Sequence, residues 1–269
     1  MLTTMLATAK RNYYIAKRVF PWSFIVQRIV IGLYTVLFSY FIYHYMFRGY
    51  LDSRFETYTG SSDYITYTIL GVSLYTFAVS TLMNVGRSLM NELREGTLEA
   101  LLLSPCSRKG YFLGNLIEQV GRSFLEFFVV LIVGWLLGAK LLNIKIEQLI
   151  IVLILSIFSF FSMGVSLATV MLRTRDTYIT QNTLFIIVSL VCGISYPIQY
   201  LPTWLQVISH VLPLTHVLEL FRKVVIFGDL LWHHWILIIK LVALSLMYLL
   251  FGFWWLSRVE KQLIEKTFG

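Results

Sequence analysis

Charged residues are scarce in this sequence. They make up 13% of its 269 residues, whereas 58% are apolar and the mean hydropathy is +0.74. A soluble domain carries about 25% charged residues, so this chain has too little charge to cover a water-soluble globule. The composition therefore excludes a soluble domain and a disordered chain, and it predicts an integral membrane protein.

Several catalytic and metal-binding motifs are missing as well. The two cysteines, Cys106 and Cys192, lack the spacing of a disulfide framework or a metal site. No histidine belongs to an HExxH motif, and there is no G-x-S-x-G, so we expect no catalytic residue and no metal. No two of the 16 glycines have the spacing of a GxxxxGK[ST] phosphate loop, so this chain is not expected to cleave ATP in that manner.

The net charge is +8, but the basic residues are scattered between apolar runs rather than gathered on one segment. Nucleic-acid binding needs a contiguous basic surface, so we expect no nucleic-acid partner. A scattered positive excess is typical of a membrane protein whose orientation is set by its basic loops.

Six segments are predicted to cross a bilayer core about 30 Å thick, which requires about 20 helical residues. They are residues 24–46, 64–85, 111–139, 149–172, 178–196 and 235–257. The charge-free part of the third segment is too short to cross, so the span has to draw in Glu126 and the charged residues before it, Arg122 and Glu118. These three share one helix face. Two roles stay open for them: a pathway or dimer contact, or an internal ion pair with one residue reaching the membrane surface.

Residues 197–222 are also apolar, but Pro197, Pro202 and Pro213 interrupt them. Proline removes a backbone donor, so a straight helix is not expected, and we interpret the segment as two short re-entrant or external helices. The alternative is a seventh span. Six spans put thirteen basic residues on the cytoplasmic side and seven outside, which favours six spans with both termini cytoplasmic in the plasma membrane.

Residues 1–21 are predicted to form an amphipathic helix on the membrane surface. Its apolar stripe is Met5, Ala9, Tyr13, Ala16 and Phe20. Anchoring to lipid and a mechanical role both stay open for this helix.

Two pairs of glycines, Gly110 with Gly114 and Gly134 with Gly138, have the G-x-x-x-G spacing that lets helices approach closely. We expect packing within the chain rather than a dimer contact.

The longest predicted cytoplasmic loop spans residues 87–110. Gly96 is expected to end one helix, Thr97 to cap the next, and Pro105 to end that one after about seven residues. The short helix would present Leu98, Leu101 and Leu102, either to a groove on a partner protein or to the protein's own membrane base. Both readings stay open from the residues alone.

The stretch NELREGTLEALLLSPCSR, followed by an apolar span, resembles the cytoplasmic loop of type-2 permeases of ATP-binding-cassette (ABC) transporters. The segment SYPIQYLPTWLQVISHVLPLTHVLELFR resembles the proline-rich segment before the last span of that family. The order and spacing of the two motifs extend the resemblance over nearly the whole chain.

The resemblance implies a single transmembrane permease domain over residues 1–269, of the exporter type. It implies a separate ATPase subunit in two copies, which binds ATP and Mg, and a second permease copy in a homodimer or heterodimer. No cofactor is implied in this chain. The coupling residues that contact the ATPase would be Glu92, Glu95, Gly96, Thr97, Leu98, Glu99, Leu101, Leu102 and Pro105. The external helices would contain Pro197, Pro202, Trp204, Pro213, His216 and Arg222.

The expected cargo is a hydrophobic or amphipathic molecule such as a drug, antibiotic, lipid or lipo-oligosaccharide. Three alternatives stay open. The chain could be the permease of a polysaccharide or teichoic-acid exporter, an integral membrane enzyme that modifies lipid, or an ion-driven transporter whose activity persists without ATP.

Overall fold

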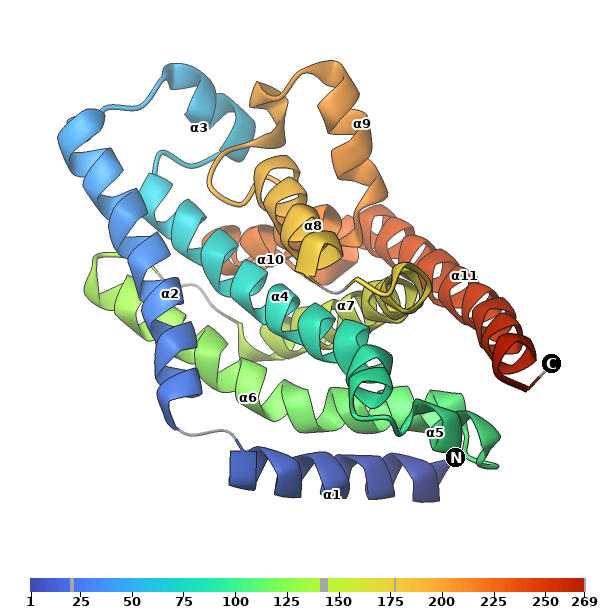
Figure 1. Ribbon diagram of the computed structural model, residues 1–269. Helices are drawn as coiled ribbons and strands as arrows, with labels where there is room; N and C mark the ends of the chain where they lie inside the picture. Colours follow the sequence, from blue (N-terminus) through green and yellow to red (C-terminus); the bar gives the residue numbers. More distant parts are fainter. Residues whose placement is uncertain (20–21, 141–144, 177, 269) are drawn as a thin grey trace.

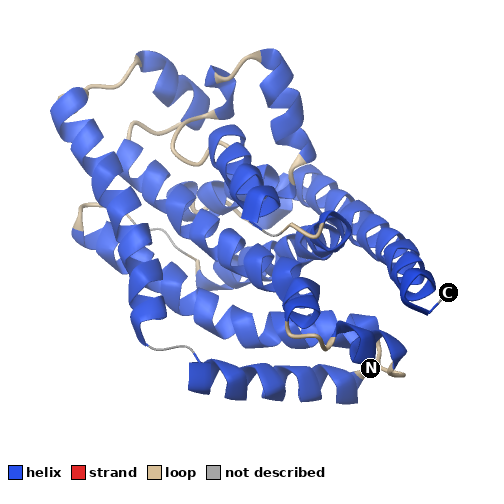
Figure 2. Cartoon of the chain, in the orientation of Figure 1, coloured by secondary structure: helices blue, strands red, loops and turns tan. Residues whose placement is uncertain are grey.

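The computed structural model describes residues 1–19, 22–140, 145–176 and 178–268, and the regular structure in these ranges is helical (Figures 1 and 2). The predicted all-α class is therefore confirmed. The α-helices are α1 (Leu2–Val19), α2 (Trp22–Phe41), α3 (Ser53–Thr59), α4 (Tyr64–Arg94), α5 (Leu98–Leu103), α6 (Arg108–Leu136), α7 (Ile146–Thr174), α8 (Tyr178–Val191), α9 (Thr203–Val211), α10 (Pro213–Phe227) and α11 (Trp235–Phe268). A π-helical turn, Ile42–Met46, and two 3-10 turns, Ile198–Tyr200 and Leu231–His234, complete the set.

Within the described residues, three helices are long and apolar enough to cross a membrane: α4, α7 and the helix over Leu231–Leu263. They support the prediction of an integral membrane protein. Helix α6 has 29 residues but carries the charged stripe, and α8 has 14 residues, which is roughly 21 Å. Crossing of the bilayer by α2, α6 and α8 stays a prediction.

The core lies around α4 and α7, with α10 packed against both of them (Figure 1). The ring of Phe77 on α4 lies 6.0 Å from that of Phe160 on α7 and 5.8 Å from that of Phe127 on α6. Phe127 in turn lies 5.9 Å from Phe221 on α10. All four rings are fully buried, so they join the two central helices to α6 and α10.

The predicted break within residues 197–222 is present as two short helices, α9 and α10. Pro202 precedes the first residue of α9, and Pro213 is the first residue of α10, where its missing N–H is harmless. Helix α10 continues past Arg222 to Phe227 and is largely buried, because its apolar side packs against α4 and α7. Its re-entrant or external position stays a prediction.

Helix α1 lies along α6 at one end of the molecule (Figure 1). A Cβ added to Gly110 would lie 2.6 Å from the Met1 carbonyl oxygen, and one added to Gly114 would lie 2.6 Å from the Met5 carbonyl oxygen. The first G-x-x-x-G pair therefore serves packing within the chain, as predicted. In the second pair, Gly134 packs against Ile69 of α4.

The face of α1 that meets α6 carries threonines. Thr4 and Thr8 approach the two glycines of α6, and Thr8 is buried, whereas Tyr13 of the predicted apolar stripe is 59% exposed. Only small side chains fit where two helix backbones come so close, which explains why threonines rather than larger apolar residues face α6. Phe20 lies outside the described residues.

Replacing Gly114 by Val is expected to separate α1 from α6, because the new Cβ would overlap both the Met5 carbonyl and the Thr8 side chain. We expect a loss of about 1–3 kcal/mol in the free energy of unfolding in detergent, and faster cleavage by trypsin at Lys10 and Lys17. Gly121→Val is the matched control, since a Cβ there meets no atom within 4 Å. Equal behaviour of the two variants would contradict the packing described.

Candidate functional site

The segment between α4 and α6 contains the helix ends that the sequence predicts. Gly96 adopts a φ of 71°, and Thr97 N donates to Glu92 O at 2.9 Å while Gly96 N donates to Leu93 O at 3.3 Å. This hydrogen-bond pattern is the Schellman ending of a helix. Helix α5 then has six residues, and Ser104 is extended before Pro105, as proline requires.

The leucines of α5 pack against the protein itself. Leu98 is 4% exposed, and Leu101 and Leu102 are half-buried against the apolar cluster that includes Leu256 and Val259 of α11. The structure therefore shows these leucines packing on the protein's own base, and their contact with a partner protein stays a prediction. The outward side of the segment carries other residues, namely Glu95, Gly96, Thr97, Glu99, Leu103 and Pro105.

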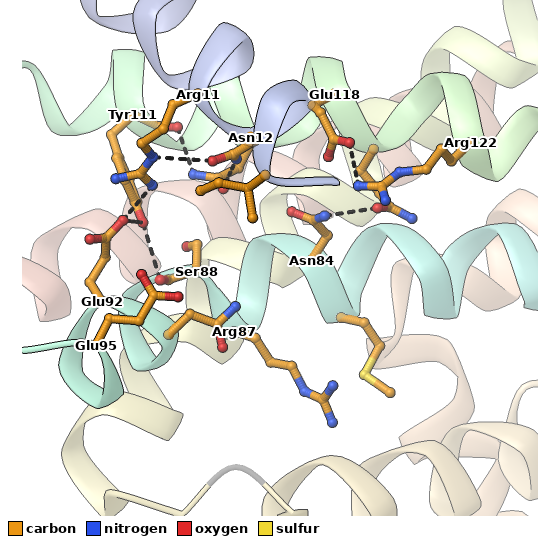
Figure 3. A pocket seen from close by; sticks show the side chains of 15 residues that line it. Arg11, Asn12, Asn84, Arg87, Ser88, Glu92, Glu95, Tyr111, Glu118 and Arg122 are labelled. Carbon is orange, nitrogen blue, oxygen red and sulfur yellow. Dashed lines mark hydrogen bonds and ion pairs between the residues drawn. The ribbon is translucent and has the colours of Figure 1, made fainter. Parts of the chain in front are cut away.

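The carboxylate of Glu92, which is 3% exposed, is the meeting point of four segments, and Figure 3 shows its contacts with Arg11 and Tyr111. Its Oε1 accepts from Arg11 Nη2 of α1 at 2.5 Å and from the Tyr111 hydroxyl of α6 at 3.0 Å. Its Oε2 accepts from the Thr97 hydroxyl at 2.5 Å. We call these four residues the Glu92 junction. It connects α1, α4, α6 and the start of α5 through a single buried charge.

The junction changes the predicted role of Thr97. This residue occupies the N-cap position of α5, but its side chain makes no capping bond, because its hydroxyl is turned toward Glu92 and its backbone is helical rather than extended. Arg11 lies outside the predicted apolar stripe of α1 and is turned onto Glu92. Partial burial of Arg11 lowers the pKa of its guanidinium, but the hydrogen bond to Glu92, the negative charge of Glu92 and the contacts with Tyr111 together outweigh that effect and raise the pKa.

A polar cleft of about 180 Å³ lies beside the junction, between α1, α4 and α6 (Figure 3). Asn12 of α1 donates to Asn115 of α6 at 2.7 Å, and Asn84 of α4 donates to Gln119 of α6 at 2.8 Å. These amide pairs hold the walls of the cleft together across helix boundaries. The cleft therefore belongs to the same polar interface as the Glu92 junction.

The charged stripe of α6 lies partly on this cleft. Glu118 pairs with Arg122 one turn away, so the internal ion pair that the sequence allowed is formed. Glu126 accepts from the Ser80 hydroxyl of α4 at 2.5 Å. A role of these residues in a pathway or dimer contact stays a prediction.

A second polar cluster joins the other end of α5 to α11. Arg108 donates from Nη1 to the Leu101 carbonyl at 2.7 Å and from Nη2 to the Leu102 carbonyl at 2.8 Å. Its Nε lies 3.1 Å from a carboxylate oxygen of Glu260 on α11. A cation at the last carbonyls of a helix satisfies acceptors that have no partner within it. We call Arg108, Glu260 and these two carbonyls the Arg108 clasp.

Arg222 was expected on an external helix, but only 8% of it is exposed. It donates to the carbonyls of Gly193 and Ile194, at 2.8 and 2.7 Å, in the turn after α8, and its guanidinium carbon lies 3.5 Å from the ring centroid of Tyr67. A Cβ on Gly71 would lie 2.0 Å from the Ile194 carbonyl oxygen, so this turn sits directly against α4. Arg222 thus binds backbone rather than solvent.

The other predicted residues of this region are dispersed. His216 Nε2 lies 2.9 Å from the carbonyl oxygen of His210, which connects α10 to the last turn of α9. Trp204 is 64% exposed on α9, and Pro197 precedes the 3-10 turn Ile198–Tyr200. The structure does not bring these residues into one site.

The sequence from residue 5 to residue 226 matches the family described as ABC-2 type transporter. The chain belongs to this family. It is therefore the membrane permease subunit of a type-2 ABC transporter, and the family implies an associated ATP-binding subunit. No curated protein matches the sequence.

Residues of the permease that sequence reasoning missed are Arg11, Tyr111 and the pair Arg108–Glu260. Arg11 and Glu92 are 81 positions apart, and no local pattern indicates such a contact. Arg108 carries a weak local signal, since a basic residue shortly after a short helix can reach back to its final carbonyls.

Replacing Glu92 by Gln is expected to destabilise the permease and loosen α1, because the charge that Arg11 pairs with is lost. Arg11→Gln and the double variant complete a thermodynamic cycle, in which we expect a coupling of about 0.5–1.5 kcal/mol, since Arg11 is half-exposed. The measurement is chemical unfolding in detergent. Glu95→Gln, an exposed neighbour, is the control and should change little. A coupling of zero would contradict the junction.

Proposed function

We propose that this permease belongs to an exporter that moves a hydrophobic or amphipathic molecule out of the cytoplasm. It would act with a second permease copy and two ATPase subunits, which bind ATP and Mg. Closure of the ATPases on ATP would press on the outward side of α5 and change the tilt of the spans. Family membership supports the transport role. The direction and the cargo class rest on the proline-rich segment, residues 195–222, which resembles that of drug and lipo-oligosaccharide exporters most closely.

The observation that carries the proposed coupling role is that α5 is bonded at both of its ends. At the N-terminal end the Glu92 junction connects it to α4, α6 and α1, and at the C-terminal end the Arg108 clasp connects it to α11. Its leucines fill the space between these connections. A force on α5 would therefore act on two of the long apolar helices, α4 and α11, without first being absorbed by a loose loop.

The contact with the ATPase would be made by the exposed residues of the segment. Glu99 and Leu103 lie on its outward side, and Leu103 is 62% exposed. An exposed leucine next to a carboxylate on a short helix suits a groove with an apolar floor and a basic rim.

Replacing Glu99 or Leu103 by Arg is expected to weaken association with the ATPase about tenfold or more, because each change places a positive charge in the contact. The measurement is ATP hydrolysis recovered with the affinity-purified permease from its native membranes. Glu56→Arg, an exposed charge reversal on α3 at the opposite end of the molecule (Figure 1), is the control. Equal recovery with all variants would overturn the coupling role of α5.

A further inference from the structure

A pocket of about 510 Å³ lies at the end of the molecule opposite α1 and α5, around the C-terminal end of α2 and around α3 (Figure 1). Its walls come from α2, the π-helical turn, the start of α4 and the segment after α8. Its volume lies within the range of about 300–1,000 Å³ that small-molecule sites have. Aromatic side chains dominate its lining, among them Phe47, Tyr50, Phe55, Tyr64, Tyr196 and Tyr200.

The rings of this pocket support one another. Tyr64 is central: its ring stacks on Tyr43 at 5.5 Å and meets the edges of Phe55 at 5.8 Å and Phe47 at 6.4 Å. Phe55 is 3% exposed and also meets Tyr67 of α4 at 5.4 Å. These contacts hold the rings of Tyr64 and Phe55 in place without a ligand, so this wall of the pocket is formed in advance.

Two backbone irregularities shape the pocket. The turn Ile42–Met46 is π-helical, a form that is rare and often marks functional sites. Arg48 and Gly49 then take positive φ values of 52° and 75°, which reverse the chain and bring residues 50–52 across from α2. A bulky residue in this conformation is strained, so the reversal is held by its surroundings.

Asp52 is the single charged residue among those that line the pocket, and the Arg54 side chain lies outside the lining, near Tyr200. Asp52 Oδ1 accepts from Arg54 N at 3.0 Å as the N-cap of α3, which fixes the position of the carboxylate. The faces of aromatic rings carry partial negative charge and attract cations. Ring faces and carboxylate therefore both favour a cation over an anion of the same shape.

We propose that this pocket binds a monovalent lipophilic cation, with its charge shared between the aromatic faces and Asp52 and its apolar groups against Phe47 and the α2 wall. Transport of such a cation rests on the proposed function, since it needs the ATPase. Binding requires this chain alone, so the two can fail separately.

The test is equilibrium dialysis of the full chain in lipid nanodiscs, without ATP or ATPase. The probe is tetraphenylphosphonium, and tetraphenylborate is its anionic counterpart of nearly equal size and shape. Binding to empty nanodiscs is subtracted. We expect saturable binding of the cation and none of the anion.

Matched variants locate the site. Asp52→Asn removes the charge but keeps a good N-cap residue, and Phe47→Leu removes a ring but keeps apolar volume. Each is expected to weaken cation binding about fivefold or more. Glu56→Gln and Tyr45→Leu, exposed neighbours that do not line the pocket, should bind as the unaltered chain does. Absence of saturable binding, equal binding of the anion, or equal effects of lining and control variants would overturn the proposal. Loss of ATPase association alone would leave it standing.

Discussion

The arrangement of this end of the permease depends on a buried carboxylate. Burying an unpaired charge is costly, so Glu92 can occupy its position only while donors from other segments reach it. Arg11, Thr97 and Tyr111 supply them from three different parts of the chain. The dependence is mutual. Glu92 holds each segment in place, and the burial of its charge is tolerated because each segment supplies a hydrogen-bond donor. Helix α1 thereby becomes part of the packed protein rather than a helix resting on lipid alone.

The structural features that depend on one residue and its immediate neighbours could be predicted from the sequence. Helix α4 begins at Tyr64, as expected, and the turn at Gly96 and the extended residue before Pro105 follow from backbone preferences that each residue carries by itself. Helix α4 ends at Arg94, next to the ending predicted at Gly96, and it continues nine residues beyond the membrane span predicted over residues 64–85. Arg87 and Arg94 lie in this extension, because a helix that leaves the apolar core can continue with charges at its surface.

Contacts between distant segments could not be predicted, because periodicity says which face of a helix is apolar and nothing about its neighbour. The same limit explains Arg222. The carbonyls after α8 act as its acceptors, and their positions depend on a turn at Gly193 and a close approach at Gly71, which become visible only in the folded chain. The leucines of α5 illustrate the limit as well. The sequence pattern of an apolar helix face is the same whether that face packs against a partner or against the protein's own core.

The six residues of α5 have different surroundings on opposite sides of the helix. The leucines turned inward pack against the permease itself, whereas Glu99 and Leu103 on the outward side are exposed. Under the proposed coupling role, substitutions on the outward side would change which ATPase the permease binds and would cost the folded permease little stability. Recognition and stability could then evolve independently on opposite sides of one helix, about 10 Å across.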